Sequence, residues 1–288
     1  MALKCPICFQ TKLPVKYTIN NYEIVQCENC KLVMLNQKLK FEEVVNLYKN
    51  NYFNSDTDGS GYLSYNTMEK ALRKNFKKRV KKIIAQTGRN IDLLDVGAGQ
   101  GFFVDECLKE GIRAEGLEIS KEALIYSRKE LKIKMYEGTI EEFKPSKKYD
   151  VITLWDVIEH VYEPNRFLKI INASLKENGF IFLSTGDIDS LLAKISGPKW
   201  HLFNLPEHAY FYSKKTIKKL LNKNNFRILS IEYPYFRYTL GYILERSLKK
   251  ILKIKNMERF KKVINLKIFR GITIPINFFD IMELKAKK

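Results

Sequence analysis

The sequence predicts an α/β fold in which a parallel β-sheet is covered by helices on both faces, with a small cysteine-rich module in front of it. Three observations support this prediction. From residue 91 onward, short apolar segments typical of strands alternate with segments typical of helices. One strand runs directly into three glycines at alternate positions, 97, 99 and 101. Two Cys-x-x-Cys pairs stand near the start of the chain.

Length and composition exclude several classes of protein. The chain has 288 residues, of which 45% are hydrophobic and 29% charged. It is therefore long enough to bury a core without disulfides, and it is not a disordered or low-complexity chain. No apolar run approaches the ~18–20 residues that cross a bilayer. The first residues lack the apolar stretch of a signal peptide, so we expect a cytoplasmic protein.

The net charge of +19 arises from 51 Lys and Arg against 32 Asp and Glu. Such a balance fits a nucleic acid, an anionic membrane surface or an acidic substrate as partner. Lysine outnumbers arginine, and Asn, Ile, Phe and Tyr are abundant, which is also the composition expected from an AT-rich genome. Both explanations stay open, and the charge by itself assigns no partner.

The small module is predicted from four cysteines in two pairs, Cys5, Cys8, Cys27 and Cys30. Their spacing is typical of a tetrahedral zinc site, because each turn directs two sulfurs to one point. Segments 14–19 and 22–26 read as the strands of a connecting hairpin. Four sulfur ligands leave no open position, so the zinc would be structural. Two disulfides or a rubredoxin-like iron are the alternatives. Cys107 stands alone and is expected to be a buried apolar residue.

The elements between and beyond these motifs follow in order. A helix over 41–48, a loop over 52–65 and a long helix over about 68–86 precede the sheet. Seven strands, with helices expected between them, are predicted at residues 91–96, 114–118, 134–137, 151–154, 180–184, 228–233 and 281–286. We accordingly divide the chain into a zinc-ribbon-like module (1–40), a helical linker (41–90) and the sheet-bearing domain (91–288).

The glycine-rich turn is the most informative segment. Glycines at 97, 99 and 101 let the backbone turn sharply and approach a ligand closely. Glu118 ends the next strand, where a carboxylate can accept both hydroxyls of a ribose. The spacing differs from the G-x-G-x-x-G of dinucleotide enzymes, and no phosphate-binding G-x-x-x-x-G-K-[ST] loop is present.

In order and spacing, these motifs resemble those of class I S-adenosylmethionine-dependent methyltransferases over most of residues 65–288. Residues 95–101 look like the first motif of that family, and residues 149–161 look like its fourth-strand motif, including the Glu-His pair found in many small-molecule members. Residues 175–184 look like the motif that leads into the fifth strand. The resemblance implies a Rossmann-like sheet of seven strands, whose last two form a reversed hairpin, and S-adenosylmethionine as methyl donor.

The resemblance also implies which residues bind the methyl donor. They are the first-motif residues and the ends of the neighbouring strands: Asp95, Gly97, Gly99, Gly101, Glu118, Ile119, Thr139 and Trp155. Glu118 would hold the ribose. Family members often carry an acid where Thr139 stands, so recognition of the adenine would here depend on a hydroxyl and on backbone groups.

Candidate catalytic residues follow the fourth and fifth strands, at the edge of the sheet where ligands bind. They are His160 after the fourth strand, and Glu207, His208 and Tyr210 after the fifth. A histidine suits removal of an acceptor proton near neutral pH. The Pro-Glu-His stretch resembles one in methyltransferases from sugar and glycan gene clusters. The alternative is that His208 and Tyr210 only pack the loop, while Ser213 caps a helix over 214–223.

A basic segment near 241–272 is predicted to be a helical insertion between the sixth and seventh strands. Ten Lys or Arg and a single acid, Glu258, lie between Arg246 and Arg270, beside an apolar stripe at helical spacing. Such a helix can contact an anionic membrane or a phosphate-bearing substrate, or it can simply pack on its own domain.

The sequence therefore favours methyl transfer from S-adenosylmethionine to a carbon or oxygen of a small molecule, above all a sugar, nucleotide-sugar or lipid-linked glycan intermediate. The rival is a ribosomal RNA base methyltransferase whose zinc module recognises RNA. A third class is a non-catalytic binding module that has kept the fold, although the intact glycine turn and Glu118 argue against it.

Overall fold

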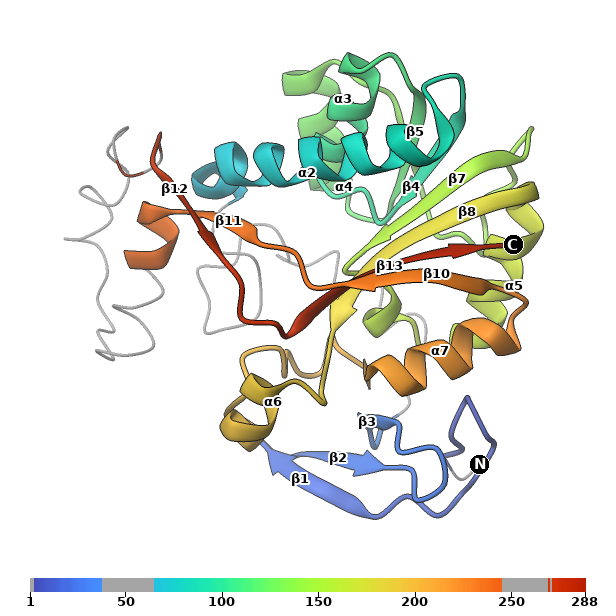
Figure 1. Cartoon of the computed structure of the whole chain (residues 1–288), viewed down its shortest axis with the longest axis vertical. Helices are drawn as coiled ribbons and strands as arrows, with labels where there is room; N and C mark the ends of the chain where they lie inside the picture. Colours follow the sequence, from blue (N-terminus) through green and yellow to red (C-terminus); the bar gives the residue numbers. More distant parts are fainter. Residues whose placement is uncertain (1–2, 38–64, 245–268, 270) are drawn as a thin grey trace.

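The computed structural model describes residues 3–37, 65–244, 269 and 271–288 (Figure 1). The predicted helix over 41–48 lies outside the described residues, as do nearly all of the predicted loop over 52–65 and most of the basic segment near 241–272. The limits proposed for the linker therefore stay a prediction.

A seven-stranded sheet forms the centre of the molecule, and all seven predicted strands are found in it. In chain order they are β4 (Asp92–Val96), β5 (Arg113–Glu118), β6 (Met135–Glu137), β7 (Tyr149–Trp155), β8 (Leu175–Gly186), β10 (Arg227–Glu232) and β13 (Ile281–Lys287). Their spatial order is β10-β13-β8-β7-β4-β5-β6. The strands from β6 to β8 are parallel, whereas β13 runs antiparallel to both β8 and β10. This confirms the reversed hairpin.

Helices cover both faces of the sheet (Figure 1). One face carries α2 (Tyr65–Thr87), α3 (Phe102–Lys109) and α4 (Lys121–Tyr126), which continues into a π-helical turn, η1 (Ser127–Leu131). The other face carries α5 (Pro164–Ser174) and α7 (Lys214–Lys223). Shorter elements lie near the carboxyl ends of the strands: η2 (Ile158–His160), α6 (Leu191–Ser196) and η3 (Gly197–Lys199).

The prediction of helices in every connection between strands was wrong in part, since the segment between β10 and β13 contains two further strands at residues 236–239 and 273–276. The segment 138–148, between β6 and β7, was expected to be helical like the other connections, but it forms only turns. Gly138, with φ of 133°, leaves the strand in a conformation that no helix uses, and Pro145 adds a second interruption.

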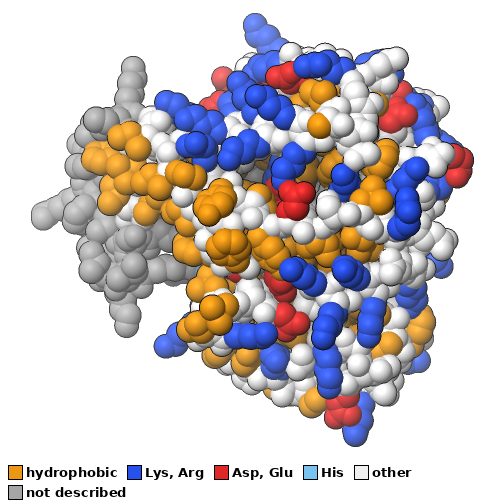
Figure 2. Space-filling model, viewed as in Figure 1, with side chains coloured by type: hydrophobic (Ala, Val, Ile, Leu, Met, Phe, Trp, Pro, Cys, Tyr) orange, Lys and Arg blue, Asp and Glu red, His pale blue; other side chains and the backbone are white. Residues whose placement is uncertain are grey.

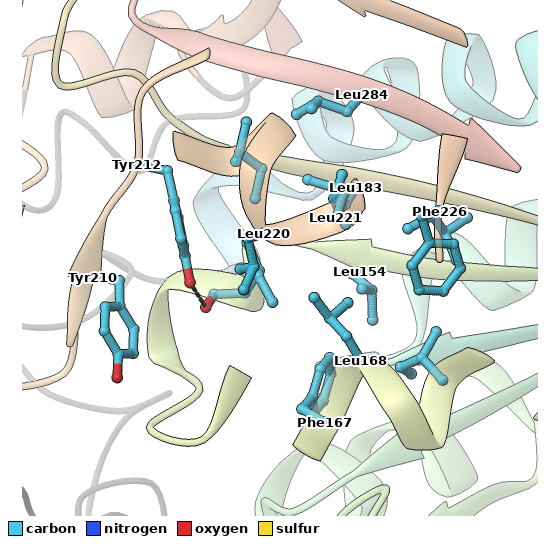
Figure 3. Close-up of a cluster of buried hydrophobic side chains, with 14 of the residues drawn as sticks. Leu154, Phe167, Leu168, Leu183, Tyr210, Tyr212, Leu220, Leu221, Phe226 and Leu284 are labelled. Atoms are coloured by element: carbon cyan, nitrogen blue, oxygen red, sulfur yellow. Dashed lines mark hydrogen bonds between the residues drawn. The ribbon is translucent and has the colours of Figure 1, made fainter. Parts of the chain in front are cut away.

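Apolar residues of the strands form a core on each side of the sheet. Leu154 and Leu183 meet Phe167 and Leu168 of α5 and Leu220 of α7, all of them buried (Figure 3). The helix α7 begins as predicted, because the Ser213 hydroxyl and Thr216 form a reciprocal capping box at its first turn.

A second sheet joins the cysteine-rich module to the main domain. Its strands are β1 (Val15–Ile19), β2 (Tyr22–Gln26), β3 (Val33–Leu35) and β9 (Tyr210–Phe211), in that order. The predicted hairpin is thus confirmed, but its sheet is completed by a strand from the loop after β8. A separate pair, β11 (Phe236–Thr239) with β12 (Thr273–Ile276), contacts α2.

The face shown in Figure 2 presents no single basic patch. Lysine and arginine side chains are scattered across it, with acidic and apolar side chains between them. Within the described ranges, no helix has the length and apolar character that spanning a bilayer requires.

Candidate functional site

The four predicted cysteines converge on one point. The sulfurs of Cys5 and Cys30 lie 3.3 Å apart and those of Cys8 and Cys27 lie 3.4 Å apart, and all four are within 4.8 Å of one another. Four sulfurs bound to one tetrahedral zinc at ~2.3 Å would lie ~3.8 Å apart. None of the four forms a disulfide. The cluster therefore fits a metal with four sulfur ligands.

The two Cys-x-x-Cys turns have the same backbone. In each, the N–H of the first cysteine donates to the carbonyl five residues later (3.0 and 2.9 Å), and the residue after the second cysteine donates back to the first (2.8 and 3.0 Å). Phe9 and Lys31, which follow the second cysteines, both adopt left-handed φ angles of 61° and 66°. Identical turns present their sulfurs symmetrically, as a tetrahedral ion requires.

The cysteine-bearing sheet also supports the loop that carries His208. The Ala209 carbonyl accepts from the N–H of Leu35 in β3, and the Ala209 N–H donates to the carbonyl of Glu159, both at 2.9 Å. Next to the first cysteine turn, the Lys223 ammonium donates to the Pro6 carbonyl at 3.0 Å. The four-cysteine module is therefore attached directly to residues beside the candidate catalytic histidines.

We expect Cys27→Ser to lower the zinc content of freshly purified protein by about one equivalent per chain, as measured by elemental analysis. Loss of the metal should lower the free energy of unfolding by more than ~2 kcal/mol, a minor part of the ~10–16 kcal/mol with which zinc-finger peptides bind the ion. The control is Cys107→Ser, which removes a buried thiol outside the cluster and should keep the zinc. An unchanged zinc content in Cys27→Ser would contradict the site.

The glycine turn lies at the carboxyl end of β4, where the backbone adopts positive φ angles that favour glycine. Gly97, Gly99 and Gly101 have φ angles of 73°, 55° and 86°. A Cβ added at Gly97 would lie 2.7 Å from Cγ2 of Val157, and one at Gly101 would lie 2.7 Å from Cδ1 of Ile133. A side chain at Gly97 or Gly101 would therefore collide with the protein interior. The Gly97 backbone itself is exposed to solvent.

Glu118 closes the cradle that these glycines form. Its buried carboxylate accepts backbone N–H groups from Gly99 at 2.7 Å, Ile119 at 2.9 Å and Ser120 at 2.8 Å. Burial raises the pKa of Glu118, and the three N–H donors oppose that rise. The first motif and the end of the next strand therefore meet, as the sequence predicted, and Glu118 itself helps to hold the turn in place.

Two polar atoms beside the cradle suit a polar ligand. Gln100 Oε1 and Trp155 Nε1 are buried and have no hydrogen-bond partner among the described residues. Buried polar atoms of this kind are usually satisfied by a ligand or water. The Arg79 guanidinium lies over the Trp155 ring at 4.0 Å. A donor and an acceptor next to an exposed glycine backbone fit a ligand that carries both amino-acid and nucleoside groups, as S-adenosylmethionine does.

Two further predicted cofactor residues, Asp95 and Thr139, have side chains that bond other residues of the protein. Asp95 is buried, and its carboxylate accepts the Thr153 hydroxyl at 2.6 Å, which ties β4 to β7. Burial raises the Asp95 pKa to about 7. The Thr139 hydroxyl is held by Glu142 at 3.3 Å on an exposed edge. Contact of either with adenosine stays a prediction.

His160 and His208 meet although they are far apart in the sequence. Their ring centroids lie 4.5 Å apart with the planes at 89°, and His160 Nδ1 is 3.0 Å from the carbonyl oxygen of Glu207. Burial lowers the pKa of His160 to about 4, and it lowers the pKa of His208 well below its ordinary value. Both rings are therefore neutral at pH 7. Val157, three residues before His160, borders the glycine turn at Gly97.

The other two predicted catalytic residues, Glu207 and Tyr210, make different contacts. Glu207 is buried, and its Oε2 has no partner among the described residues. Its contact with the pair is made through its backbone carbonyl to His160, not through a carboxylate bond to His208. The Tyr210 hydroxyl donates to the Tyr162 carbonyl at 2.9 Å, and burial raises its pKa. Tyr210 thus has a packing contact, and its catalytic role stays a prediction.

Sequence reasoning did not single out Glu159 as a functional side chain, although it stands in the Glu-His pair. It is 5% exposed and lies against both histidines. Asn204, whose amide nitrogen is 3.4 Å from His208 Nε2, was also missed. The Glu-His pair was a signal for the first; no local pattern marks the second.

Fold and cradle together define a class I S-adenosylmethionine-dependent methyltransferase domain. A family model described as a methyltransferase domain matches residues 68–231, more than half of the chain, and the protein belongs to this family.

Curated relatives agree with this assignment. The ubiquinone biosynthesis O-methyltransferase of Pelagibacter ubique is 29% identical over 155 residues, which cover 50% of this chain and 65% of that protein. The enzyme of the same name from Pasteurella multocida is 32% identical over 146 residues, covering 44% and 60%. The matched region is thus less than two thirds of either relative's length.

Solved structures share the fold. A 1,6-didemethyltoxoflavin-N1-methyltransferase of Burkholderia thailandensis superposes with a TM-score of 0.54 at 14% identity, covering 94% of this chain and 97% of that one. A S-adenosylmethionine-dependent methyltransferase from Archaeoglobus fulgidus gives 0.51 at 22% identity, covering 75% and 94%. At such identities the likeness concerns the fold alone.

Proposed function

We propose that this protein transfers the methyl group of S-adenosylmethionine to a hydroxyl of a small molecule bound beside His160 and His208. The observation that carries the proposal is the contact of Val157 with Gly97. If the donor binds at Gly97, this contact supports an acceptor site beside the segment that leads into the histidine pair. The sulfonium of the donor already makes its methyl group electrophilic, so the protein has to supply alignment and removal of the acceptor's proton.

Different residues of this chain would bind the methyl donor and the acceptor. Gly97 and Gly99 present backbone to the amino-acid part of the donor, and Glu118 presents a carboxylate to its ribose. The acceptor would lie between the cradle and the histidine pair, where neutral imidazoles meet the buried Glu159 side chain. His208 is buried and His160 is partly buried, so polar contacts to the acceptor there would be stronger than in water.

The acceptor itself is proposed from two sources. The Pro-Glu-His stretch favours a sugar, nucleotide-sugar or lipid-linked glycan, while the curated relatives are named for O-methylation in ubiquinone biosynthesis. A hydroxyl acceptor is common to both. The RNA alternative rests on the four-cysteine module and on the net charge, and basic side chains are scattered over the face shown in Figure 2.

A panel assay separates these acceptors. Formation of S-adenosylhomocysteine is measured with nucleotide sugars and polyprenyl-linked sugars in one set, phenolic ring compounds in a second, and ribosomal RNA in a third. We expect turnover with a hydroxyl compound of the first or second set. Turnover with RNA alone would favour the rival, and failure to bind S-adenosylmethionine in calorimetry would leave only a non-catalytic module.

Glu118→Ala should weaken S-adenosylmethionine binding by about 10- to 150-fold in Kd. The carboxylate contributes charge-assisted hydrogen bonds worth about 1.5–3 kcal/mol, and its loss also frees the N–H of Gly99. Calorimetric titration measures the effect. The matched control is Glu177→Ala, at the opposite end of the sheet, whose side chain is 82% exposed. Equal affinities in the two variants would refute the placement of the ribose.

A further inference from the structure

We propose that Glu159, His160 and His208 bind one divalent transition-metal cation, separate from the ion of the four cysteines. The three side chains offer ligand atoms that all lie within 4.8 Å of one another. The inference deepens the proposed function, and rests on it only for the role of the ion in activating an acceptor. Binding of the ion itself requires no methyl transfer.

The hydrogen bond of His160 fixes the ring in the form that a metal requires. A carbonyl oxygen only accepts, so the 3.0 Å contact with Glu207 places the ring proton on Nδ1. Nε2 then carries a lone pair and no proton. Metal-bound histidines characteristically donate their other N–H to a backbone carbonyl or a carboxylate in this way.

His208 is held in place by neighbouring residues. Its Nε2 lies 3.4 Å from the amide nitrogen of Asn204. The residue that follows, Ala209, is held on both sides by the carbonyl of Glu159 and the N–H of Leu35. Tyr212 adds a bond from its hydroxyl to the Ile158 carbonyl, just before Glu159 (Figure 3, dashed line). Two segments distant in sequence are thus fixed against each other at the cluster.

Glu159 supplies the unsatisfied atom. The side chain is buried, and its carboxylate lies beside the two imidazoles. Oε2, however, has no hydrogen-bond partner among the described residues. A carboxylate oxygen that is removed from water and left without a donor is costly. A cation shared with the two imidazoles would satisfy it.

The donor set indicates the class of cation. Two imidazole nitrogens and one carboxylate suit Zn²⁺, Co²⁺, Fe²⁺ or Mn²⁺, whereas Ca²⁺ and Mg²⁺ prefer oxygen ligands. Three protein ligands leave at least one coordination position open. Under the proposed function, the oxygen of the acceptor hydroxyl would take that position, where a cation lowers the hydroxyl pKa.

The test uses the full chain with zinc already bound at its cysteines. The protein is titrated with Co²⁺, whose binding is followed by visible absorption, and firmly bound metal is counted after desalting. We expect about one additional Co²⁺ per chain with a nitrogen and oxygen ligand spectrum. Glu159→Gln and His160→Ala should weaken this binding at least tenfold.

Two controls keep the result interpretable. Glu159→Gln keeps the shape of the side chain, and retained S-adenosylmethionine binding shows that a variant is folded. His201→Ala removes the third histidine of the chain, which lies beside Asp280 outside the cluster, and should leave Co²⁺ binding unchanged. No binding beyond the cysteine site in the wild type, or equal binding in Glu159→Gln, would overturn the proposal. Neither result needs an acceptor, so failure here is distinguishable from failure of the proposed methyl transfer.

Discussion

His208→Ala is expected to lower turnover by about 10²–10⁴-fold while leaving the affinity for S-adenosylmethionine nearly unchanged. The proton of a hydroxyl acceptor must leave as the methyl group arrives, and the His160–His208 pair lies where that acceptor would bind. The effect should appear in kcat, because the ring acts on the reacting oxygen and not on the cofactor. The assay uses the acceptor found by the panel described above.

The control for this prediction is again His201→Ala, with turnover expected within about threefold of wild type. His208→Gln should fall as far as alanine while preserving more of the buried volume, which separates chemistry from packing. Full turnover in His208→Ala would show that His208 is a packing residue. His160 would then be the candidate that removes the proton. The loss is expected whether the imidazole removes the proton or binds a cation, and Co²⁺ binding distinguishes the two roles.

Gly97→Ala is expected to weaken S-adenosylmethionine binding by about 5- to 150-fold. The added Cβ would stand 2.7 Å from Val157 Cγ2 at a backbone φ of 73°. Without ligand, the variant is expected to relieve this overlap by moving the turn away from its ligand-binding position. Binding must restore that position, so the ~1–3 kcal/mol cost of overpacking weakens the binding of the ligand. Calorimetry measures it.

A matched glycine separates this effect from backbone strain. Gly88 has almost the same φ, 74°, but nothing lies within 4 Å of a Cβ built there. Because Gly88 has a left-handed backbone, Gly88→Ala should lower the free energy of unfolding about as much as Gly97→Ala does. It should leave the affinity for the cofactor unchanged. Adding Val157→Ala to Gly97→Ala makes room for the new methyl group and should recover part of the affinity. An equal loss of affinity in Gly88→Ala would contradict the argument.

The sequence by itself determined those features that depend only on residues close together in the chain. Apolar strands of the central sheet, the glycine turn and the Cys-x-x-Cys turns are each specified by neighbouring residues, so periodicity and spacing predict them. The capping of α7 by Ser213 is equally local. Even the meeting of Glu118 with Gly99 follows locally, since adjacent parallel strands bring their carboxyl ends together.

Only the tertiary structure decided how the four-cysteine module and the histidines are placed. The strands β3 and β9 have three and two residues, too few to show any periodicity, and they become strands only because they pair with each other. That pairing, with the bonds of Ala209, brings His208 against His160 and Glu159. A sequence pattern records which residues suit a strand, but contacts between distant segments depend on how whole elements pack, and that is where this candidate site is assembled.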